Sequence, residues 1–297
     1  MALDEPRIRM AVQKSGRLTD KSVELLTRAG LRFEWAKDRL FCRADNFPCD
    51  LMFLRDDDIP EYVKDGVCDL GLVGLNVLEE KLLQCGDGRG TRTLKRMGFG
   101  QCRLSLAVPN GFEYEGPSSL DGLRIATSYP ATTARFLDRN GVTASIVGIS
   151  GSVEIAPALK IADVICDLVS TGSTLRSNGL REVQTILESE SVLVCTEKAL
   201  PATKEREIER LLQRLEGVMR AAETKYIMMN APRAALAHVR RLLPGMENPS
   251  IMPLEGTNDH IAIHAVSRET IFWETMEDLK AAGASSILVL PIEKIIG

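Results

Sequence analysis

The stretch of the sequence richest in potential chemistry is "ICDLVSTGSTLRSNGL", residues 165–180. An apolar segment that contains Asp167 ends at Val169. Small or hydroxylated residues follow it: Ser170, Thr171, Gly172, Ser173 and Thr174. Between a strand and a helix, such a loop offers backbone N–H groups, alcohols and a positive helix dipole, which suit a phosphate. The Walker pattern with its lysine is absent. Ordinary helix capping by Ser and Thr is the alternative interpretation.

Two acidic residues could assist this loop. Asp167 is either a turn residue at a strand end or an acceptor for sugar hydroxyls and a partner for a phosphate-bound metal. Oxygen ligands of this kind suit Mg²⁺, which often keeps several waters and binds through phosphates. Glu154, in "GSVEIAP", is explained as well by a charge at a helix start as by a catalytic or metal-linked role. We expect Mg²⁺ to bind through substrate phosphates, without a dedicated protein cage.

A basic turn lies near the amino terminus, in "QKSGRLTD". Lys14 and Arg17 flank Ser15 and Gly16 just before an expected helix, where two cations have the wrong sign for the helix dipole. A bound anion would compensate, because arginine can hold a phosphate through two hydrogen bonds. A solvated basic turn is the alternative.

Weaker candidates surround this turn. In "CDLGLVG", residues 68–74, a strand runs into glycine, which permits either close approach to a flat ligand or close packing. Tyr129, in "TSYPAT", could stack on a base. In "RDDDIP" we expect Asp57 or Asp58 to cap a short helix with Pro60 in its first turn, rather than to bind metal.

Composition limits the function classes. The chain has 297 residues, 44% of them apolar and 26% charged, as in soluble proteins of two or three domains. No apolar run approaches the roughly 20 residues of a membrane span and the start does not resemble a signal peptide, so we expect a cytoplasmic protein. A net charge of −4 argues against a nucleic-acid partner. The three histidines lie in the last quarter, so chemistry before them proceeds without imidazole.

Strand-like and helix-like segments alternate along the first 200 residues, which predicts an α/β fold with a largely parallel sheet. Strands are expected in "RIRMAV", "DLMFLR" and "VCDLGLVG", and Asn76 should open the helix "NVLEEKLLQ". "LRIATSYPATTARFLDRNG" repeats the strand, loop and helix of the amino terminus. Two lobes are therefore expected, with ligand loops at the carboxyl ends of strands. Lobe I would comprise residues 1–105 and 188–222, and lobe II residues 106–187.

The remaining quarter has its own pattern. Residues 204–222 carry one apolar stripe at three- and four-residue steps, which indicates an amphipathic helix. Residues 223–297 then follow the order strand, helix, strand, strand, helix, strand, which is the ferredoxin-like (ACT-like) βαββαβ arrangement. A small domain of this type more often regulates or assembles than catalyses.

Several segments together resemble one family over essentially the whole chain. They are "QKSGRL", "RDDDIP", "DGVCDLG", "ATSYP", "CDLVSTGSTL", "KYIMM" and "FWETMEDLKAAGASSILVLPIEK". The sequence is similar to the long form of the ATP phosphoribosyltransferases, which have a two-lobed, periplasmic-binding-protein-like catalytic region and a regulatory domain. This resemblance implies Mg²⁺-dependent transfer of phosphoribosyl from 5-phosphoribosyl 1-pyrophosphate to N1 of ATP, with release of pyrophosphate, as the first step of histidine biosynthesis.

The resemblance also assigns residues. The phosphoribosyl donor would bind at Asp167 and residues 170–174. Residues facing ATP or pyrophosphate would be Lys14, Gly16, Arg17, Asp69, Gly71, Gly74 and Tyr129. L-Histidine, as feedback inhibitor of a homohexamer built from dimers, would bind between regulatory domains at Asn230, Ser250, Ala284 and Ser285. Asn230 departs from an acid that relatives can carry there, which would pair with imidazole, so the resemblance implies inhibition by histidine but does not fix its strength.

A different class also fits two α/β lobes around a cleft, namely a non-catalytic protein that binds or senses a small anion. Such proteins are typically exported, and the expected absence of a signal peptide argues against this class. An inactive regulatory subunit of the same family is a third interpretation. The intact hydroxylated loop and the complete regulatory domain argue against it.

Overall fold

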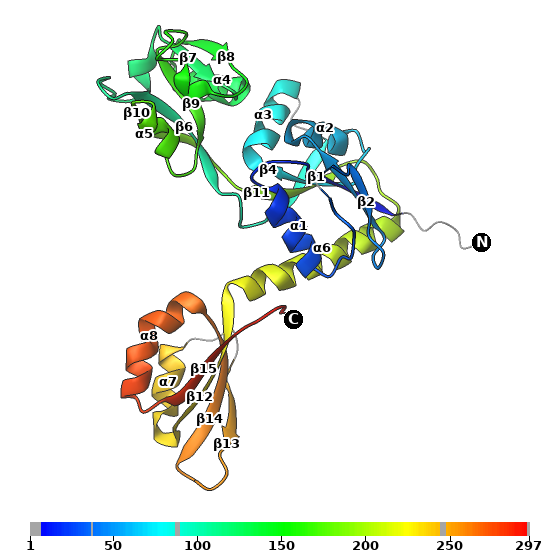
Figure 1. Ribbon diagram of the computed structural model, residues 1–297, viewed down its shortest axis with the longest axis vertical. Coiled ribbons are helices and arrows are strands. Elements are labelled where there is room, and N and C mark those ends of the chain that lie inside the picture. Colours follow the sequence, from blue (N-terminus) through cyan, green and yellow to red (C-terminus); the bar gives the residue numbers. More distant parts are fainter. Residues whose placement is uncertain (1–6, 37, 87–89, 244–247, 296–297) are drawn as a thin grey trace, which may run out of the picture. The chain divides into compact units, whose positions relative to one another are not determined.

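The computed structural model describes residues 7–36, 38–86, 90–243 and 248–295. The chain divides into two compact units, of which the first runs to Glu24 and resumes over Leu31–Glu207. The second comprises Leu25–Gly30 and the chain from Ile208 onward. Within the described residues, the first unit contains a six-stranded and a five-stranded sheet and the second a four-stranded sheet (Figure 1).

The six-stranded sheet forms lobe I, with strand order β2-β3-β1-β4-β11-β5. Its strands are β1 Ile8–Gln13, β2 Phe41–Arg43, β3 Cys49–Leu54, β4 Leu70–Gly74, β5 Thr91–Arg96 and β11 Ser191–Thr196. Its helices are α2 Ile59–Lys64, α3 Leu75–Cys85 and the first parts of α1 Thr19–Arg28 and α6 Ala202–Ala222. β1, β3 and β4 are almost wholly buried, as expected for strands covered on both faces.

The prediction of a largely parallel sheet is wrong in detail. Only the pairs of β1 with β3 and with β4 are parallel in lobe I, whereas β2, β5 and β11 pair antiparallel with their neighbours. The reason lies in the chain path, because β11 returns from lobe II and enters between β4 and β5. β5 was not anticipated, since its sequence "TRTLKR" is polar and charged, as is typical of an edge strand.

The five-stranded sheet forms lobe II, with strand order β10-β6-β9-β7-β8. Its strands are β6 Cys102–Pro109, β7 Arg124–Thr127, β8 Ser145–Gly148, β9 Val164–Val169 and β10 Leu180–Ser189. Two helices accompany them, α4 Pro130–Arg139 and α5 Ser173–Ser177. A core that includes Leu104, Leu106, Ile125 and Val164 is fully buried. The two-lobed α/β architecture expected from the repeated sequence theme is thus confirmed.

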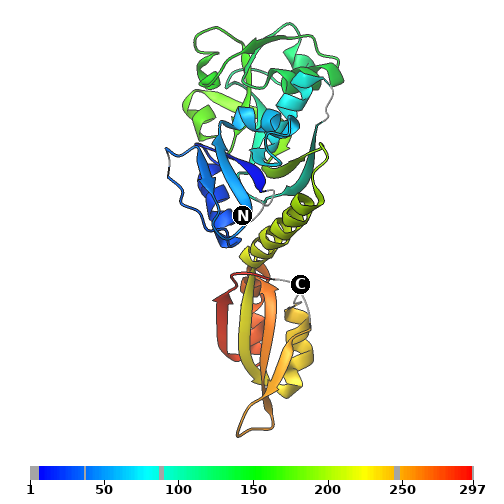
Figure 2. The ribbon, with the colours of Figure 1, turned by 90° about the vertical axis from the view of Figure 1, so that its right-hand side faces the viewer.

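The second unit has the predicted βαββαβ order, with strands arranged β13-β14-β12-β15. Its elements are β12 Thr224–Pro232, α7 Leu236–Leu242, β13 Ser250–Pro253, β14 His260–Arg268, α8 Glu269–Ala281 and β15 Ser285–Pro291. Both helices cover one face of the sheet (Figure 2), where Val239 and Leu279 pack on Ile227 and Ile263. The ferredoxin-like domain is confirmed. No described helix meets the length and hydropathy needed to cross a membrane.

Two helix starts differ from the sequence expectation. Gly74, not Asn76, occupies the N-cap of α3, and Asn76 lies in its first turn with its side chain bonded to other elements. Asp58 does occupy the N-cap of α2, but its side chain makes no capping hydrogen bond. At α3 residue type alone misplaced the cap, because Ser189 and Glu190 from a distant part of the chain accept the N–H groups of Asn76 and Leu75.

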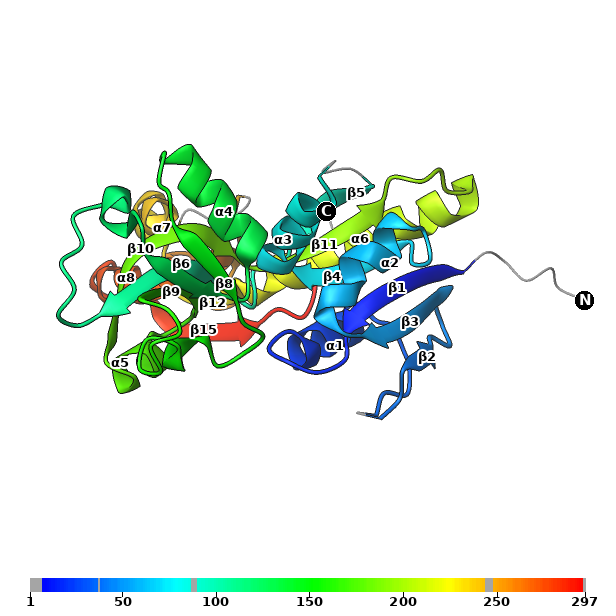
Figure 3. The same cartoon turned by 90° about the horizontal axis from the view of Figure 1, so that it is seen from above.

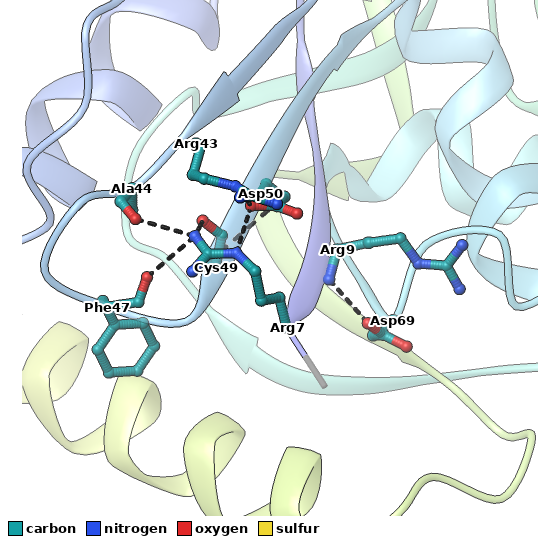
Figure 4. A network of polar contacts seen from close by, with 8 residues as sticks. All are labelled: Arg7, Arg9, Arg43, Ala44, Phe47, Cys49, Asp50 and Asp69. Carbon is teal, nitrogen blue, oxygen red and sulfur yellow. Dashed lines mark hydrogen bonds and ion pairs between the residues drawn. The ribbon is translucent and has the colours of Figure 1, made fainter. Parts of the chain in front are cut away.

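A buried ion pair attaches α6 to the sheet of lobe I. Lys204 Nζ lies 2.7 and 2.9 Å from the two carboxylate oxygens of Asp69, which is only 2% exposed. The Arg9 N–H donates to the same carboxylate at 2.7 Å (Figure 4). Nearby, Arg7 bonds Asp50 at 2.7 Å and ties the start of β1 to β3.

Replacing Lys204 by methionine should lower the free energy of unfolding by about 3 kcal/mol, because it leaves the buried Asp69 carboxylate without its cation. Urea-induced unfolding measures the change. Arg39→Ala, which removes an exposed pair with Glu34, is the matched control and should cost about 1 kcal/mol or less. Equal costs for the two variants would contradict the assigned role of the buried pair.

Candidate active site

The hydroxylated segment of residues 170–174, here the hydroxyl loop, follows β9 and includes the first two residues of α5; it lies at the molecular surface. Ser170, Thr171, Ser173 and Thr174 are exposed. Gly172 has φ of 71°, in the left-handed region, and an added Cβ would lie 3.2 Å from the guanidinium of Arg176. The loop is therefore open to a ligand and its backbone conformation favours glycine.

Two arginines fix the direction of the loop's peptide groups. Arg103 donates to the Ser170 carbonyl at 3.2 Å, and Arg176 donates to the Thr171 carbonyl at 3.3 Å. In a trans peptide the N–H points opposite to the C=O. The amides of Thr171 and Gly172 therefore point away from these guanidinium groups.

Inside the loop, the hydroxyls of Thr171 and Ser173 lie 3.0 Å apart, and the Ser173 N–H reaches Thr171 Oγ1 only at 3.4 Å. That contact is at the long limit of a hydrogen bond. Alcohols and amides are thus gathered over a short span of chain, an arrangement that can receive several oxygen atoms of one anion.

Arg17 brings the basic turn of lobe I to this loop. Its Nη1 donates to Ser170 Oγ at 3.3 Å and its Nη2 to Cys102 Sγ at 3.3 Å. The turn wraps over Gln13, whose side-chain oxygen accepts the Leu18 N–H at 3.0 Å. Gly16 has φ of 133° and an added Cβ would lie 2.6 Å from the Gln13 amide nitrogen, so this position requires glycine.

Charged and aromatic groups converge beside Arg17. Burial raises the pKa of Asp167 above its ordinary value, and the negative charge of Glu154 raises it further, while the Leu168 N–H and Arg17 oppose the shift. Burial likewise raises the pKa of the Tyr129 phenol, with smaller effects from Asp167 and Arg17. The structure therefore brings these residues from both lobes within electrostatic range of one another.

Other residues from the sequence analysis lie elsewhere or serve packing. Asp69 precedes β4, at the end of the strand opposite to Gly74, and its carboxylate is held by Lys204. Gly71 lies under α2, where a Cβ would come within 2.8 Å of Ile59 and 2.9 Å of Val63. Gly74 ends β4, and a Cβ there would lie 2.5 Å from Asn76 Oδ1. Lys14 is half-buried and its N–H donates to the Leu54 carbonyl at 2.7 Å.

A cavity of about 490 Å³ adjoins the hydroxyl loop through Ser170. It is lined by Arg96, Gln101, Cys102, Arg103, Ser170, Glu188, Ser189 and Glu190. Apart from Ser170, these residues belong to the two segments in which the chain passes from one lobe to the other. The sequence analysis did not identify Arg103, because it lies in an ordinary strand pattern. It did not identify Arg176 either, because a basic residue is common in the last turn of a helix. No cluster of three or more metal-binding side chains occurs among the described residues.

In the second unit, three of the four residues expected to bind histidine lie together. Asn230 is the register partner of Ser285 across β12 and β15, and Ala284 precedes Ser285. A cavity of about 490 Å³ is lined by Trp273, Met276, Lys280, Ala284, Ser285, Ser286, Ile287 and Val289. Ser250 pairs with His264 at the opposite edge of the sheet, with β14 and β12 between it and β15.

Fold and site define a two-lobed α/β protein with an exposed hydroxylated loop after β9 and a ferredoxin-like domain that follows the lobes in the chain. The model of the family described as HisG, ATP phosphoribosyltransferase, matches residues 55–217, and that of the HisG C-terminal domain matches residues 221–294. The chain belongs to the ATP phosphoribosyltransferase family. Its activity is transfer of phosphoribosyl to ATP in histidine biosynthesis.

Solved structures give related matches. A chain of the ATP phosphoribosyl transferase (HisG:HisZ) complex from Thermotoga maritima is 26% identical, with a TM-score of 0.59, covering 70% of this chain and 98% of that one. The sulfonate-binding protein SsuA from Methylobacillus flagellatus is 14% identical, with a TM-score of 0.48 and coverages of 72% and 68%. XAC2383 from Xanthomonas citri, bound to ATP, is 15% identical, with a TM-score of 0.47 and coverages of 73% and 84%.

If the phosphoribosyl donor binds at Asp167, as the resemblance implies, replacing Glu154 by glutamine should shift the acid limb of its pH-dependent binding to lower pH. Loss of the neighbouring negative charge lowers the pKa of Asp167, so this carboxylate stays ionised further into acid. Binding of the donor measured by calorimetry between pH 4 and 8 tests the shift. Glu154→Asp keeps the charge and is the control; an unmoved limb in the glutamine variant would refute the coupling.

Proposed function

We propose that the hydroxyl loop binds the 5-phosphate of 5-phosphoribosyl 1-pyrophosphate and that Asp167 accepts hydrogen bonds from its ribose hydroxyls. The observation that carries this assignment is the contact between Arg17 and Ser170, which places a cation of lobe I over the loop of lobe II. The exposure of the loop supports the same assignment, as does the direction of its Thr171 and Gly172 amides away from the guanidinium groups of Arg103 and Arg176.

On this proposal Lys14, Gly16 and Arg17 face the pyrophosphate or the ATP phosphates. Both substrates are polyanions, so the positive charge of the Arg17 guanidinium reduces their repulsion as they meet. Gly74 and Tyr129 border the adenine. Asn76 donates to the Tyr129 hydroxyl at 2.8 Å and so fixes the direction of a half-buried ring. Asp69 and Gly71 are proposed to act only through the shape of β4.

The chemistry needs little from a general base. Adenine N1 carries its own lone pair, and departure of pyrophosphate leaves positive charge on the ribose ring. Positioning and charge stabilisation can therefore supply most of the rate enhancement. The ionised Asp167 would stabilise that positive charge, which accords with histidines being confined to residues 238 and beyond.

Mg²⁺ fits the residues present. The negative charge of Glu154 raises the pKa of Asp167, and a divalent cation bound beside Asp167 would offset that repulsion. We propose that these two carboxylates hold Mg²⁺ together with the pyrophosphate of the phosphoribosyl donor. The ion would supply neutralisation of the leaving pyrophosphate.

Feedback inhibition by L-histidine is proposed for the second unit. Asn230, Ala284 and Ser285 would contact the amino acid, and the cavity beside Ala284 and Ser285 supports this. Because Ser250 lies at the other edge of the sheet, we propose that a second copy of the chain contributes it. That requires a homo-oligomer, with a dimer as building block and a hexamer as the expected assembly. The cytoplasmic location stays a prediction.

The direct test mixes the purified protein with ATP, the phosphoribosyl donor and Mg²⁺, adds pyrophosphatase, and follows the absorbance of the adduct. Turnover that stops on chelation of Mg²⁺ and returns on its re-addition is expected. Absence of turnover, with binding of the phosphoribosyl donor retained, would instead favour the anion-binding class.

Thr171→Ala and Asp167→Ala should each weaken binding of the phosphoribosyl donor about tenfold, the loss expected for one or two hydrogen bonds to a charged ligand. The affinity for ATP should stay within about twofold. Ser177→Ala, at the exposed end of α5, is the matched control. Calorimetric titration of each ligand alone provides the measurement, and equal weakening of both ligands would overturn the assignment of lobes.

Asn230→Asp should strengthen inhibition by L-histidine roughly fivefold, because a carboxylate–imidazolium pair adds about 1 kcal/mol. The gain should be larger at pH 6 than at pH 8, since the imidazole loses its proton between them. Thr257→Asp adds the same charge in the turn between β13 and β14 and should change little. An unaltered inhibition constant in the Asn230 variant would argue against a role for this residue.

A further inference from the structure

The start of α4 in lobe II is capped by a carboxylate from lobe I. Tyr129 holds the N-cap position but supplies no capping hydrogen bond. Instead the N–H groups of Ala131 and Thr132 each donate to Glu80 of α3 at 2.8 Å, and so does the Thr132 hydroxyl. Glu80 is only 5% exposed. Figure 3 shows α3 beside α4 at this contact.

Asn76, one turn earlier on α3, makes a second connection. Its Nδ2 donates to the Tyr129 hydroxyl at 2.8 Å, while its Oδ1 accepts from the Ser189 hydroxyl at 2.8 Å. The Asn76 N–H donates back to Ser189 Oγ at 3.0 Å. Ser189 ends β10, just before the chain returns to lobe I. Gly74 leaves room for this side chain, because a Cβ there would overlap Asn76 Oδ1.

These contacts resist rotation of one lobe against the other. Opening the α3–α4 contact would strip a buried carboxylate of three donors, and leaving such a charge unpaired is strongly unfavourable. It would also expose the unpaired N–H groups at the start of α4. The same rotation would move the hydroxyl loop of lobe II away from Arg17 of lobe I.

We propose that Asn76 and Glu80 are positioning residues that set the angle between the lobes at which the hydroxyl loop faces Arg17. They touch neither substrate and act through Tyr129, through α4 and through Ser189, where the chain returns from lobe II to lobe I. This inference rests on the proposed function, because it concerns the alignment of two substrates held by different lobes. A purely structural cap would affect stability alone.

The test compares Glu80→Ala, Glu80→Gln and Asn76→Ala with the wild type in the full-length protein. For Glu80→Ala, kcat should fall at least about tenfold, since reaction between two bound groups is sensitive to their alignment. The dissociation constant of the phosphoribosyl donor alone should stay within about twofold, because the hydroxyl loop lies on β9 and α5. Glu80→Gln keeps one acceptor oxygen and should lose less activity. Asn76→Ala should also lower kcat.

Gln84→Ala is the matched control. Gln84 donates to Glu80 Oε1 at 2.9 Å from within α3 and does not bridge the lobes, so kcat should stay within about twofold. A thermal melt confirms that each variant is folded. If Glu80→Ala does not fold, the kcat values of Glu80→Gln and Asn76→Ala decide whether the proposal holds. An unchanged kcat in these variants would overturn the proposal. So would a loss of affinity for the phosphoribosyl donor that matches the loss of kcat. An inactive wild type would refute the proposed function instead.

Discussion

The backbone N–H groups at helix starts must find partners, and around the boundary between the lobes this requirement organises the structure. Ser189 supplies the partner for α3 and Glu80 the partner for α4, each from a distant part of the chain. At the hydroxyl loop the neighbouring arginines bond carbonyls instead and leave the amides of Thr171 and Gly172 directed away from them. Two helix starts thus join the lobes, while the loop before α5 stays open for a ligand.

Much of the fold was predictable because it depends on local pattern. The alternation of strands and helices, the hydroxyl loop and the βαββαβ order all follow from periodicity and turn residues. The polar edge strand β5 could not be predicted, because its charged sequence lacks the apolar pattern of a buried strand. The capping partners of α3 and α4 could not be predicted either, since Asn76 and Ser189 are 113 residues apart and Glu80 and Thr132 are 52 residues apart. Only the folded chain brings such pairs together.

The glycines mark another limit of sequence reasoning. Gly16 is required by its backbone angle, Gly71 by the close approach of α2, and Gly74 by the side chain of Asn76. One residue type therefore serves three purposes in the packing of the chain, and none of the three can be read from the glycine pattern of the sequence. Asp69 is a parallel case, because its neighbour in space, Lys204, is 135 residues away in sequence.

The account depends on the amides of the hydroxyl loop receiving a phosphate while Arg17 closes over it. A crystal structure with 5-phosphoribosyl 1-pyrophosphate and Mg²⁺ tests this most directly. We predict the 5-phosphate within hydrogen-bonding distance of the Thr171 and Gly172 N–H groups, with the pyrophosphate toward Arg17. A phosphate bound elsewhere, with those amides bonded to protein, would contradict it.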